Sequence, residues 1–262
     1  MEKTTITILG SGTSSGVPLL QCKCRVCRSK NPKNHRLRAS AWVQFRGKSF
    51  LIDTSTDLRQ QALRAKIPRL DAVLYTHPHA DHAHGIDELR SFNFVQRESI
   101  PVYGNEWTRT ELIQKFSYIF KPPHHIEGGG IPLLTLHPVD TAAESLTVAG
   151  TRVVPISLQH GSKECVAYRF DRIAYVTDCS YIPPSSLERL KGLDVLVLDC
   201  LRFEPHGTHF NLDQALAVIE QVKPKRAFLT HLSHDFDYAT FKLPGKLPKG
   251  VALAYDGLKV RV

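Results

Sequence analysis

The sequence predicts an α/β sandwich in which two β-sheets pack face to face and helices cover their outer sides. Two observations predict this fold class: strand-like apolar runs occur in hairpin-like pairs, and isolated helical patterns are interspersed among them. The predicted strands are residues 4–9, 41–45, 50–53 and 72–76, and then residues 152–158, 165–170, 173–177, 194–199, 226–230 and 251–255.

The predicted helices stand between these strands, where apolar residues recur with the period of one helix face. They are residues 57–66, 85–92, 106–118, 185–190 and 212–222. Residues 121–131 are predicted to form a flexible loop because they contain Pro122, Pro123 and three consecutive glycines. No internal repeat or linker interrupts the pattern, so we expect residues 1–262 to form one domain.

The composition fits a globular protein that folds without disulfide bonds. The chain has 262 residues, 42% of them hydrophobic and 23% charged, which is enough to bury a sizeable core. The start has an acidic Glu2 and only a short apolar run, unlike a secretory signal. No apolar run is long enough to span a bilayer. We therefore expect a cytoplasmic protein with no membrane partner.

The formal net charge is +9, but the lysines and arginines are scattered along the chain rather than gathered in one tract. Such a surface is either simply solvated or attractive to phosphate groups. The charge pattern favours neither interpretation.

Polar residues capable of binding metal follow several apolar strands directly. Asp53, His77, Asp178 and His231 each stand where the chain leaves a predicted strand. Functional groups in layered α/β proteins gather at such strand ends, because a rigid sheet aims short loops at one cleft. These residues therefore predict one shared site.

The most specific motif follows the strand at residues 72–76. It reads Thr76-His77-Pro78-His79-Ala80-Asp81-His82. In a tight turn, His77 and His79 can converge on one ion while Asp81 and His82 reach a second, and imidazole and carboxylate ligands suit Zn, Mn or Fe. Neither ion is completed locally, so the remaining ligands must come from elsewhere. His160, Asp178 and His231 also end strands, and the Asp178 carboxylate is the natural candidate to bridge two ions.

This ligand pattern resembles that of the metallo-β-lactamase-fold hydrolase superfamily, and the resemblance extends from the Gly10–Thr13 turn to Tyr255-Asp256-Gly257. It implies a four-layer αββα sandwich with two divalent ions, Mn or Zn, in the active site. One ion would be held by His77, His79 and His160 and the other by Asp81, His82 and His231, with Asp178 bridging them. The resemblance gives Asp53 a supporting role rather than that of a ligand.

Within the superfamily, the sequence is most similar to the phosphoribosyl 1,2-cyclic phosphate phosphodiesterase (PhnP-like) family. Four motifs carry this similarity: Gly10-x-Gly12-x-x-x-Gly16-Val17-Pro18, Cys22-x-Cys24-x-x-Cys27, Thr208-His209-Phe210-Asn211-Leu212 and Thr230-His231-Leu232-Ser233-His234. The resemblance implies hydrolysis of a small phosphodiester such as a phosphoribosyl cyclic phosphate or a nucleotide.

Three closely spaced cysteines predict a separate structural zinc site at about residues 20–35. Cys22, Cys24 and Cys27 can supply three thiolates, and the spacing leaves His35, His234 or a distant cysteine as the fourth ligand. The resemblance selects His234. The other cysteines, Cys165, Cys179 and Cys200, lie in strand contexts and are expected in the core.

The expected reaction also needs proton transfer. The resemblance implies that His209 is the general acid that protonates the departing alkoxide, and His206 is the local alternative. Asp81 is expected to orient the attacking water. His84 is predicted to support the metal site or to start a helix, and His124 and His125 are predicted to face solvent.

Three other functions remain compatible with the sequence. The first is a thioester or lactone hydrolase of the same fold. The second is an RNA-processing phosphodiesterase of the tRNA 3′-processing type, although no long basic arm for gripping structured RNA is present. The third is a metal-binding protein without turnover. A homodimer is compatible with all of them, and residues 91–134 are expected to shape the substrate pocket.

Overall fold

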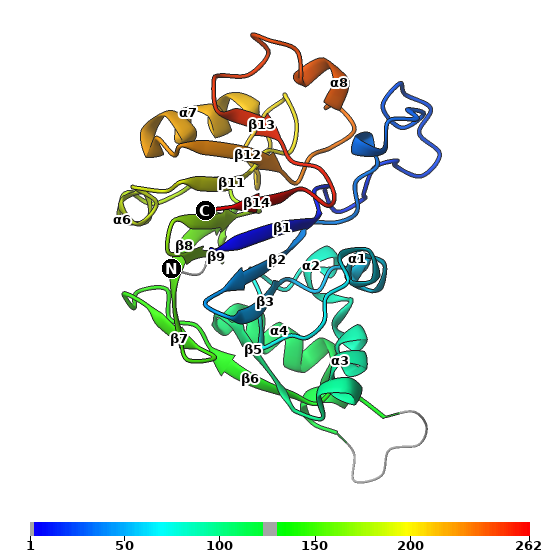
Figure 1. Ribbon diagram of the computed structural model, residues 1–262, viewed down its shortest axis with the longest axis vertical. Coiled ribbons are helices and arrows are strands. Elements are labelled where there is room, and N and C mark those ends of the chain that lie inside the picture. Colours follow the sequence, from blue (N-terminus) through cyan, green and yellow to red (C-terminus); the bar gives the residue numbers. More distant parts are fainter. Residues whose placement is uncertain (1–2, 123–129) are drawn as a thin grey trace.

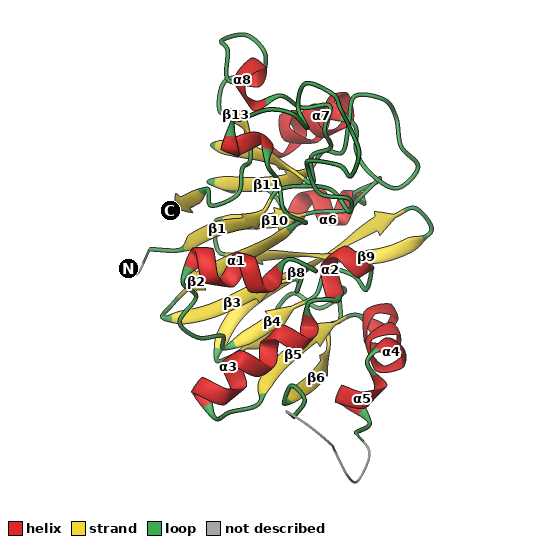
Figure 2. Ribbon diagram, turned by 90° about the vertical axis from the view of Figure 1, so that its right-hand side faces the viewer, coloured by secondary structure: helices red, strands yellow, loops and turns green. Residues whose placement is uncertain are grey.

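Two seven-stranded sheets pack face to face in the computed structural model, which describes residues 3–122 and 130–262 (Figure 1). Helices pack on the outer side of each sheet, and those that cover the first sheet lie in front of its strands in Figure 2. This arrangement confirms the predicted four-layer αββα sandwich. Within the described residues, no helix is long and apolar enough to cross a membrane.

The first sheet has the strand order β14-β1-β2-β3-β4-β5-β6. Strand β1 pairs antiparallel with β14 and β2, whereas β3 to β6 run parallel to one another. The strands are β1 (Thr5–Gly10), β2 (Ser40–Phe45), β3 (Lys48–Ile52), β4 (Ala72–Leu74), β5 (Ile100–Gly104), β6 (Leu134–Pro138) and β14 (Lys259–Arg261).

The second sheet has the order β13-β12-β11-β10-β9-β8-β7. Its strands β10 to β13 are parallel, and β7, β8 and β9 form antiparallel hairpins. The strands are β7 (Leu146–Val148), β8 (Thr151–His160), β9 (Lys163–Phe170), β10 (Ile173–Val176), β11 (Val195–Asp199), β12 (Arg226–Thr230) and β13 (Val251–Leu253).

Short helices connect the strands and cover the sheets. Asn211 begins α7 with a capping box, in which its side chain accepts from the Gln214 amide and the Gln214 side chain accepts in return. The helices are α1 (Leu58–Ala65), α2 (Ala80–Ala83), α3 (Leu89–Gln96), α4 (Glu106–Lys115), α5 (Ser117–Phe120), α6 (Pro184–Arg189), α7 (Leu212–Val222) and α8 (Tyr238–Phe241), with 3-10 turns η1 (Pro32–Asn34) and η2 (Ile86–Glu88).

Three apolar layers hold the sandwich together. Alternate residues of each strand point inward, so that Ile6, Phe50 and Phe170 meet between the sheets. The outward side chains of the first sheet pack on α1, α3 and α4, and those of the second sheet pack on α6 and α7. Cys165, Cys179 and Cys200 are buried, as the sequence predicts.

The structure differs from the sequence prediction mainly between residues 85 and 150. The helix predicted at 85–92 is a 3-10 turn followed by α3, and the one predicted at 106–118 breaks at Phe116 into α4 and α5. Strands β5, β6, β7 and β14 and helix α8 were not predicted. These elements are short, and Pro101 and Pro138 interrupt the strand pattern of β5 and β6.

Candidate metal centres

The segment from His77 to His82 lies just beyond strand β4. The Asp53 carboxylate, rather than a neighbouring strand, accepts the hydrogen bond from the backbone amide of Thr76, the residue before this segment. The Asp53 carboxylate, fully buried at the end of β3, accepts from the Thr76 amide at 2.7 Å and from the Thr76 hydroxyl at 2.8 Å. Strand β4 therefore ends at Leu74, two residues before the predicted end. His77 and His79 follow in the turn, and the short helix α2 carries Asp81 and His82.

The distal residues arrive from the second sheet. His160 is the last residue of β8, Asp178 follows β10 and His231 follows β12. Asp178 and His231 have φ angles of 53° and 60°, in the left-handed region, and Asp53 has 62°. Such backbone strain is typical of functional sites where tertiary packing fixes the conformation.

The first group is formed by His77, His79 and His160, which can offer ligand atoms within 4.8 Å of one another. The Nε2 atom of His77 lies 3.0 Å from Nδ1 of His79. The His160 Nδ1 donates to the Thr208 carbonyl at 2.8 Å, which leaves its Nε2 free to act as a ligand.

The second group is formed by Asp81, His82, Asp178 and His231. The Nε2 atom of His82 lies 3.2 Å from Asp81 Oδ2 and 3.3 Å from Asp178 Oδ1. The Nε2 atom of His231 lies 3.4 Å from Asp178 Oδ2. The same Oδ2 atom is 3.7 Å from His77 Nε2, so Asp178 stands between the two groups.

These separations fit metal coordination. Ligands on a tetrahedral ion, with bonds of about 2.0–2.1 Å, stand roughly 3.4 Å apart. Moreover, Nε2 of His82 and both ring nitrogens of His231 are buried and form no hydrogen bond with the described residues. A buried polar atom without a partner is costly, and a divalent ion would satisfy the two Nε2 atoms. The donor set therefore fits two ions, and the individual ligand roles stay predictions.

The local electrostatics also suit cations. Burial and the neighbouring His82 hold the pKa of His77 well below its usual value, which keeps the imidazole neutral as a ligand must be. Burial alone would lower the pKa of His82, but Asp178, Asp81 and Asp53 raise it well above its usual value. The carboxylates around His82 thus favour positive charge there, which a metal ion can supply instead of a proton.

Asp53 supports this centre rather than joining it. Its Oδ2 atom accepts from His82 Nδ1 at 2.8 Å, which orients the ring with Nε2 facing the ligand cluster. Burial raises the pKa of Asp53 against the opposing effect of His82. This geometry agrees with the supporting role expected for Asp53.

His209 lies beside the ligand cluster. Its ring stacks on that of His231, with centroids 4.6 Å apart, and its Nε2 is 3.9 Å from Asp178 Oδ2. On the other side, Nδ1 lies 3.3 Å from Asp199 Oδ1. Burial alone would lower the pKa of His209, but Asp199 and Asp178 raise it to about 9.

Asp199 is a functional candidate that the sequence prediction missed. It ends β11, is fully buried, and accepts from the backbone amides of Phe210 at 3.0 Å and Asp178 at 3.1 Å. It thereby ties His209 to the metal cluster. The sequence contained a signal for this residue, because Asp199 stands at the end of an apolar strand, much as Asp178 does.

Trp107 is a second missed residue. It lies near the start of α4, with its ring centroid 5.6 Å from that of His79 and 6.1 Å from that of His77. The exposed Lys163 places its Nζ 5.8 Å from the Trp107 ring. No local motif marks Trp107, because only the packing of α4 brings it to the site. It accords with the expectation that residues 91–134 shape the pocket.

The remaining predicted histidines lie further from the cluster. His206 is exposed, and its Nδ1 accepts from the Thr208 hydroxyl at 3.1 Å. His84 follows α2 and packs edge-on against Phe116, with centroids 5.3 Å apart. His124 and His125 lie outside the described residues.

The cysteine cluster forms a separate candidate site. His234 Nδ1 lies 3.3 Å from Cys22 Sγ, 3.7 Å from Cys24 Sγ and 3.5 Å from Cys27 Sγ. A zinc ion with three thiolates and one imidazole would hold sulfur and nitrogen about 3.6 Å apart. His35 instead bonds the Ser29 carbonyl at 2.8 Å. The geometry therefore favours His234 as the fourth ligand.

The same loop is fastened to the active-site side by a buried arginine. Arg36 donates to the carbonyl groups of Ser233 at 3.0 Å and Phe236 at 2.6 Å, on either side of His234.

Within the cysteine cluster, the Cys27 backbone amide lowers the pKa of Cys24 to about 7, whereas burial raises the pKa of Cys27 to about 11. A thiolate at Cys24 is thus available near neutral pH.

Comparison with known proteins identifies the family. Residues 48–232, more than half of the chain, match the Beta-lactamase superfamily domain. The chain belongs to this superfamily. The crystal structure of a new diphosphatase from the PhnP family covers 100% of this chain and 98% of that one, with a TM-score of 0.90 and 42% identity. The predicted metallo-β-lactamase fold and its closeness to the PhnP family are confirmed.

Two further known proteins are similar to this chain. The Zn²⁺-bound PqqB from Methylobacterium extorquens has a TM-score of 0.72, 19% identity and coverage of 98% and 99%, which shows the shared fold. A protein named octanoyltransferase from Porphyromonas gingivalis (strain ATCC BAA-308 / W83) is 37% identical over 96% of this chain and 50% of its own length. The chain thus spans half the length of that relative.

Proposed function

We propose that this superfamily member hydrolyses a small phosphodiester or diphosphate with two divalent ions. The observation that carries the proposal is His209, an imidazole held by Asp199 at 3.3 Å beside the seven candidate ligands. Such a group can protonate a poor alkoxide or phosphate leaving group. The 42% identity to a PhnP-family diphosphatase supports the same class of substrate.

The residues that would hold the ions are His77, His79, Asp81, His82, His160, Asp178 and His231. When bound, two divalent ions supply positive charge for the phosphoryl oxygens and lower the pKa of water to near neutrality. Whether Mn or Zn is the native metal depends on availability as well as on these ligands.

The protein's own side chains would donate the proton and position the substrate. The Asp199 carboxylate accepts from His209 Nδ1–H, so a proton on Nε2 faces Asp178 and the ligand cluster, where the leaving oxygen would take it. Asp81 offers a carboxylate oxygen that can accept a hydrogen bond from the attacking water. Trp107 gives the organic part of the substrate a flat wall, and Lys163 places a positive charge beside it.

A second candidate function is acyl thioester hydrolysis. The name of the Porphyromonas gingivalis relative favours this class, because octanoyltransferases act on acyl groups. Against it, an acyl transfer to water releases a thiolate, which leaves without a proton and gives His209 no task.

The test is a panel of substrates assayed with Mn²⁺ and with Zn²⁺. It contains bis(p-nitrophenyl) phosphate, a ribose cyclic phosphodiester, a dinucleoside diphosphate, a phosphate monoester, an octanoyl thioester and a precursor tRNA with a 3′ extension. We expect kcat/KM for a diester or diphosphate to exceed that for the monoester and the thioester by about 100-fold or more. Faster thioester cleavage, with no diesterase activity under any metal condition, would overturn the proposal.

A further inference from the structure

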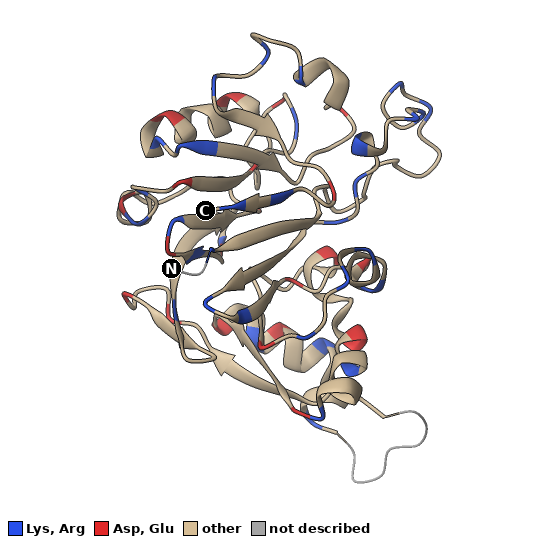
Figure 3. Ribbon diagram, viewed as in Figure 1, with Lys and Arg blue, Asp and Glu red and all other residues tan. Residues whose placement is uncertain are grey.

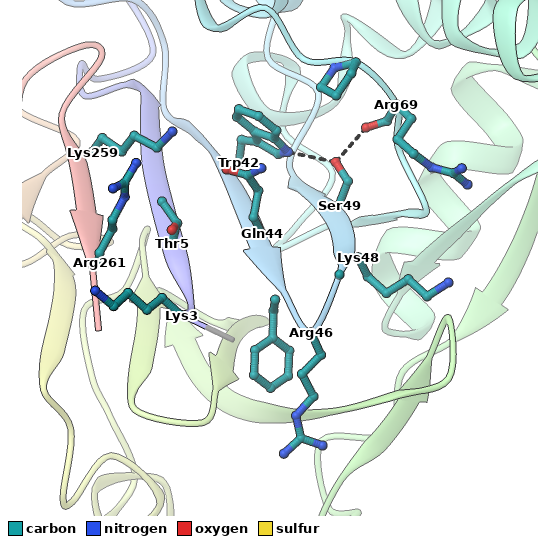
Figure 4. A pocket seen from close by; sticks show the side chains of 13 residues that line it. Lys3, Thr5, Trp42, Gln44, Arg46, Lys48, Ser49, Arg69, Lys259 and Arg261 are labelled. Carbon is teal, nitrogen blue, oxygen red and sulfur yellow. Dashed lines mark hydrogen bonds between the residues drawn. The ribbon is translucent and has the colours of Figure 1, made fainter. Parts of the chain in front are cut away.

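A hollow of about 470 Å³ lies on the outer face of the first sheet, where the helices leave the strands uncovered (Figure 4). Its floor comes from β1, β2 and β3, through Thr5, Gln44 and Ser49, with Trp42 beside them. Trp42 is anchored there, because its Nε1 donates to Ser49 Oγ at 2.8 Å. Nothing in the proposed hydrolysis uses this hollow.

Six cationic side chains stand around this floor, and the lining contains no acidic residue. Figure 4 shows them on two sides of the floor: Lys3, Lys259 and Arg261 on one, and Arg46, Lys48 and Arg69 on the other. The charges on β14 and at the β2–β3 turn are also visible in Figure 3.

Much of this charge is not neutralised. Arg46, Lys259 and Arg261 are exposed, and none of them forms an ion pair with a residue that the structure describes. Lys48 and Arg69 share one carboxylate, that of Asp71, at 4.0 and 2.9 Å. The hollow therefore has a strongly positive potential.

The positive charge continues beyond the hollow in both directions. A hollow of about 190 Å³ shares Trp42 and Lys259 with it and adds Arg64, which is paired with Asp256 at 3.3 Å. On the other side, a hollow of about 330 Å³ shares Arg46 and adds Arg152 and Arg169.

A fourth hollow, of about 270 Å³, continues from Arg152 and Arg169 to Arg189, and the guanidinium groups of Arg169 and Arg189 already donate to backbone carbonyl groups. The four hollows, joined through their shared lining residues, are called the basic track here. Its lining includes only two acidic residues, Asp171 and Glu144.

The part of the basic track around Arg152 is remote from the candidate metal centres. Arg152 lies near the start of β8, and His160 is the last residue of the same strand. Eight residues of extended chain separate them, which corresponds to about 26 Å. A ligand at that part of the track would therefore not compete with a small substrate at the metals.

The shape of the track decides among its possible occupants. A small polyphosphate would fill one hollow and leave the charges of the others unused. A second copy of this chain, meeting the same surface across a two-fold axis, would oppose cations to cations. A membrane is not favoured, since none of the exposed large hydrophobic residues lines the track.

A nucleic-acid strand fits a long row of positive charges, because it carries one negative charge per nucleotide along an extended backbone. We propose that the basic track binds the sugar–phosphate backbone of a single-stranded nucleic acid. This goes beyond the proposed hydrolase function and does not depend on it. Because the contacts are to phosphates, binding has little base specificity and weakens with salt.

The experiment is fluorescence anisotropy with labelled 2′-O-methyl RNA, which resists hydrolysis, in lengths of about 6, 12 and 20 nucleotides. The variant is Arg46→Glu/Lys259→Glu/Arg261→Glu, three exposed positions in the track. The control is Lys242→Glu/Lys246→Glu/Lys249→Glu, three exposed lysines outside all four hollows that give the same change in net charge. Circular dichroism verifies that both variants are folded.

We expect affinity to rise with RNA length, and the track variant to raise Kd by about 30-fold or more while the control raises it less than about 3-fold. The slope of log K against log salt should fall by about 2 in the track variant alone. Equal losses in both variants, or none in either, would overturn the proposal. So would binding of ATP or of phosphatidylglycerol vesicles that depends on the track while RNA binding does not.

Discussion

Replacing Asp178 by asparagine is expected to lower kcat by about 1,000-fold or more on the best substrate of the panel. The Asp178 carboxylate lies between the two ligand groups. Its Oδ2 atom is 3.7 Å from His77 Nε2 and 3.4 Å from His231 Nε2, and its Oδ1 atom is 3.3 Å from His82 Nε2. An amide removes the negative charge that would bind both ions. The loss should exceed the roughly 10- to 100-fold typical of residues that only support a ligand.

Asp171→Asn is the matched control for this substitution. Asp171 has a φ of 52°, almost that of Asp178 at 53°, and it is exposed in the β9–β10 turn. Asparagine tolerates this conformation at both positions. Steady-state kinetics should show the control within about twofold of the wild type. A kcat for Asp178→Asn within tenfold of the wild type would show that no bridging carboxylate is needed.

Replacing His209 by alanine is expected to lower kcat by about 10²- to 10⁴-fold on a substrate with an alkoxide leaving group. The loss should be much smaller on bis(p-nitrophenyl) phosphate, because nitrophenolate leaves without a proton. Asp199→Asn should cause a smaller loss with the same dependence on the leaving group, since Asp199 acts by positioning His209.

Metal content separates two roles for His209. Asp178, Asp199, His209 and His231 can also offer ligand atoms within 4.8 Å of one another, so His209 could be a ligand instead of an acid. Retention of both active-site ions in His209→Ala supports the acid role. Loss of an ion, or an equal rate loss for both leaving groups, would contradict it. His206→Ala serves as the control and should change kcat by less than about tenfold.

The sequence was sufficient to predict the elements that carry the site. Strands β4 and β10, which precede His77 and Asp178, are fully buried apolar runs, and such runs have a strong local signal. The spacing of the His77 to His82 segment alone predicted that it starts two metal sites, and the structure places its side chains in two groups of possible ligands. His160, Asp178 and His231 are brought together by the pairing of strands β8, β9, β10, β11 and β12 within the second sheet, and they lie close to that segment because the two sheets pack face to face.

The features that the sequence did not predict depend on tertiary packing. Trp107 reaches His79 because α4 packs against the first sheet, and no local pattern reports that contact. The spacing of the cysteines did not decide the fourth ligand of the cysteine cluster for the same reason, because His234 is more than 200 residues from Cys27 in the sequence. The basic track was invisible because scattered residues such as Arg46, Arg152 and Lys259 become neighbours only in the folded chain.

The metal content of the reconstituted protein tests the central claim most directly. Mass spectrometry of the bound metals should give three divalent ions per chain, two at the seven-residue cluster and one at the cysteine cluster. The Cys22→Ser/Cys24→Ser variant should lose one ion and keep the active-site pair. Fewer than two ions per chain in fully reconstituted wild-type protein would contradict the account.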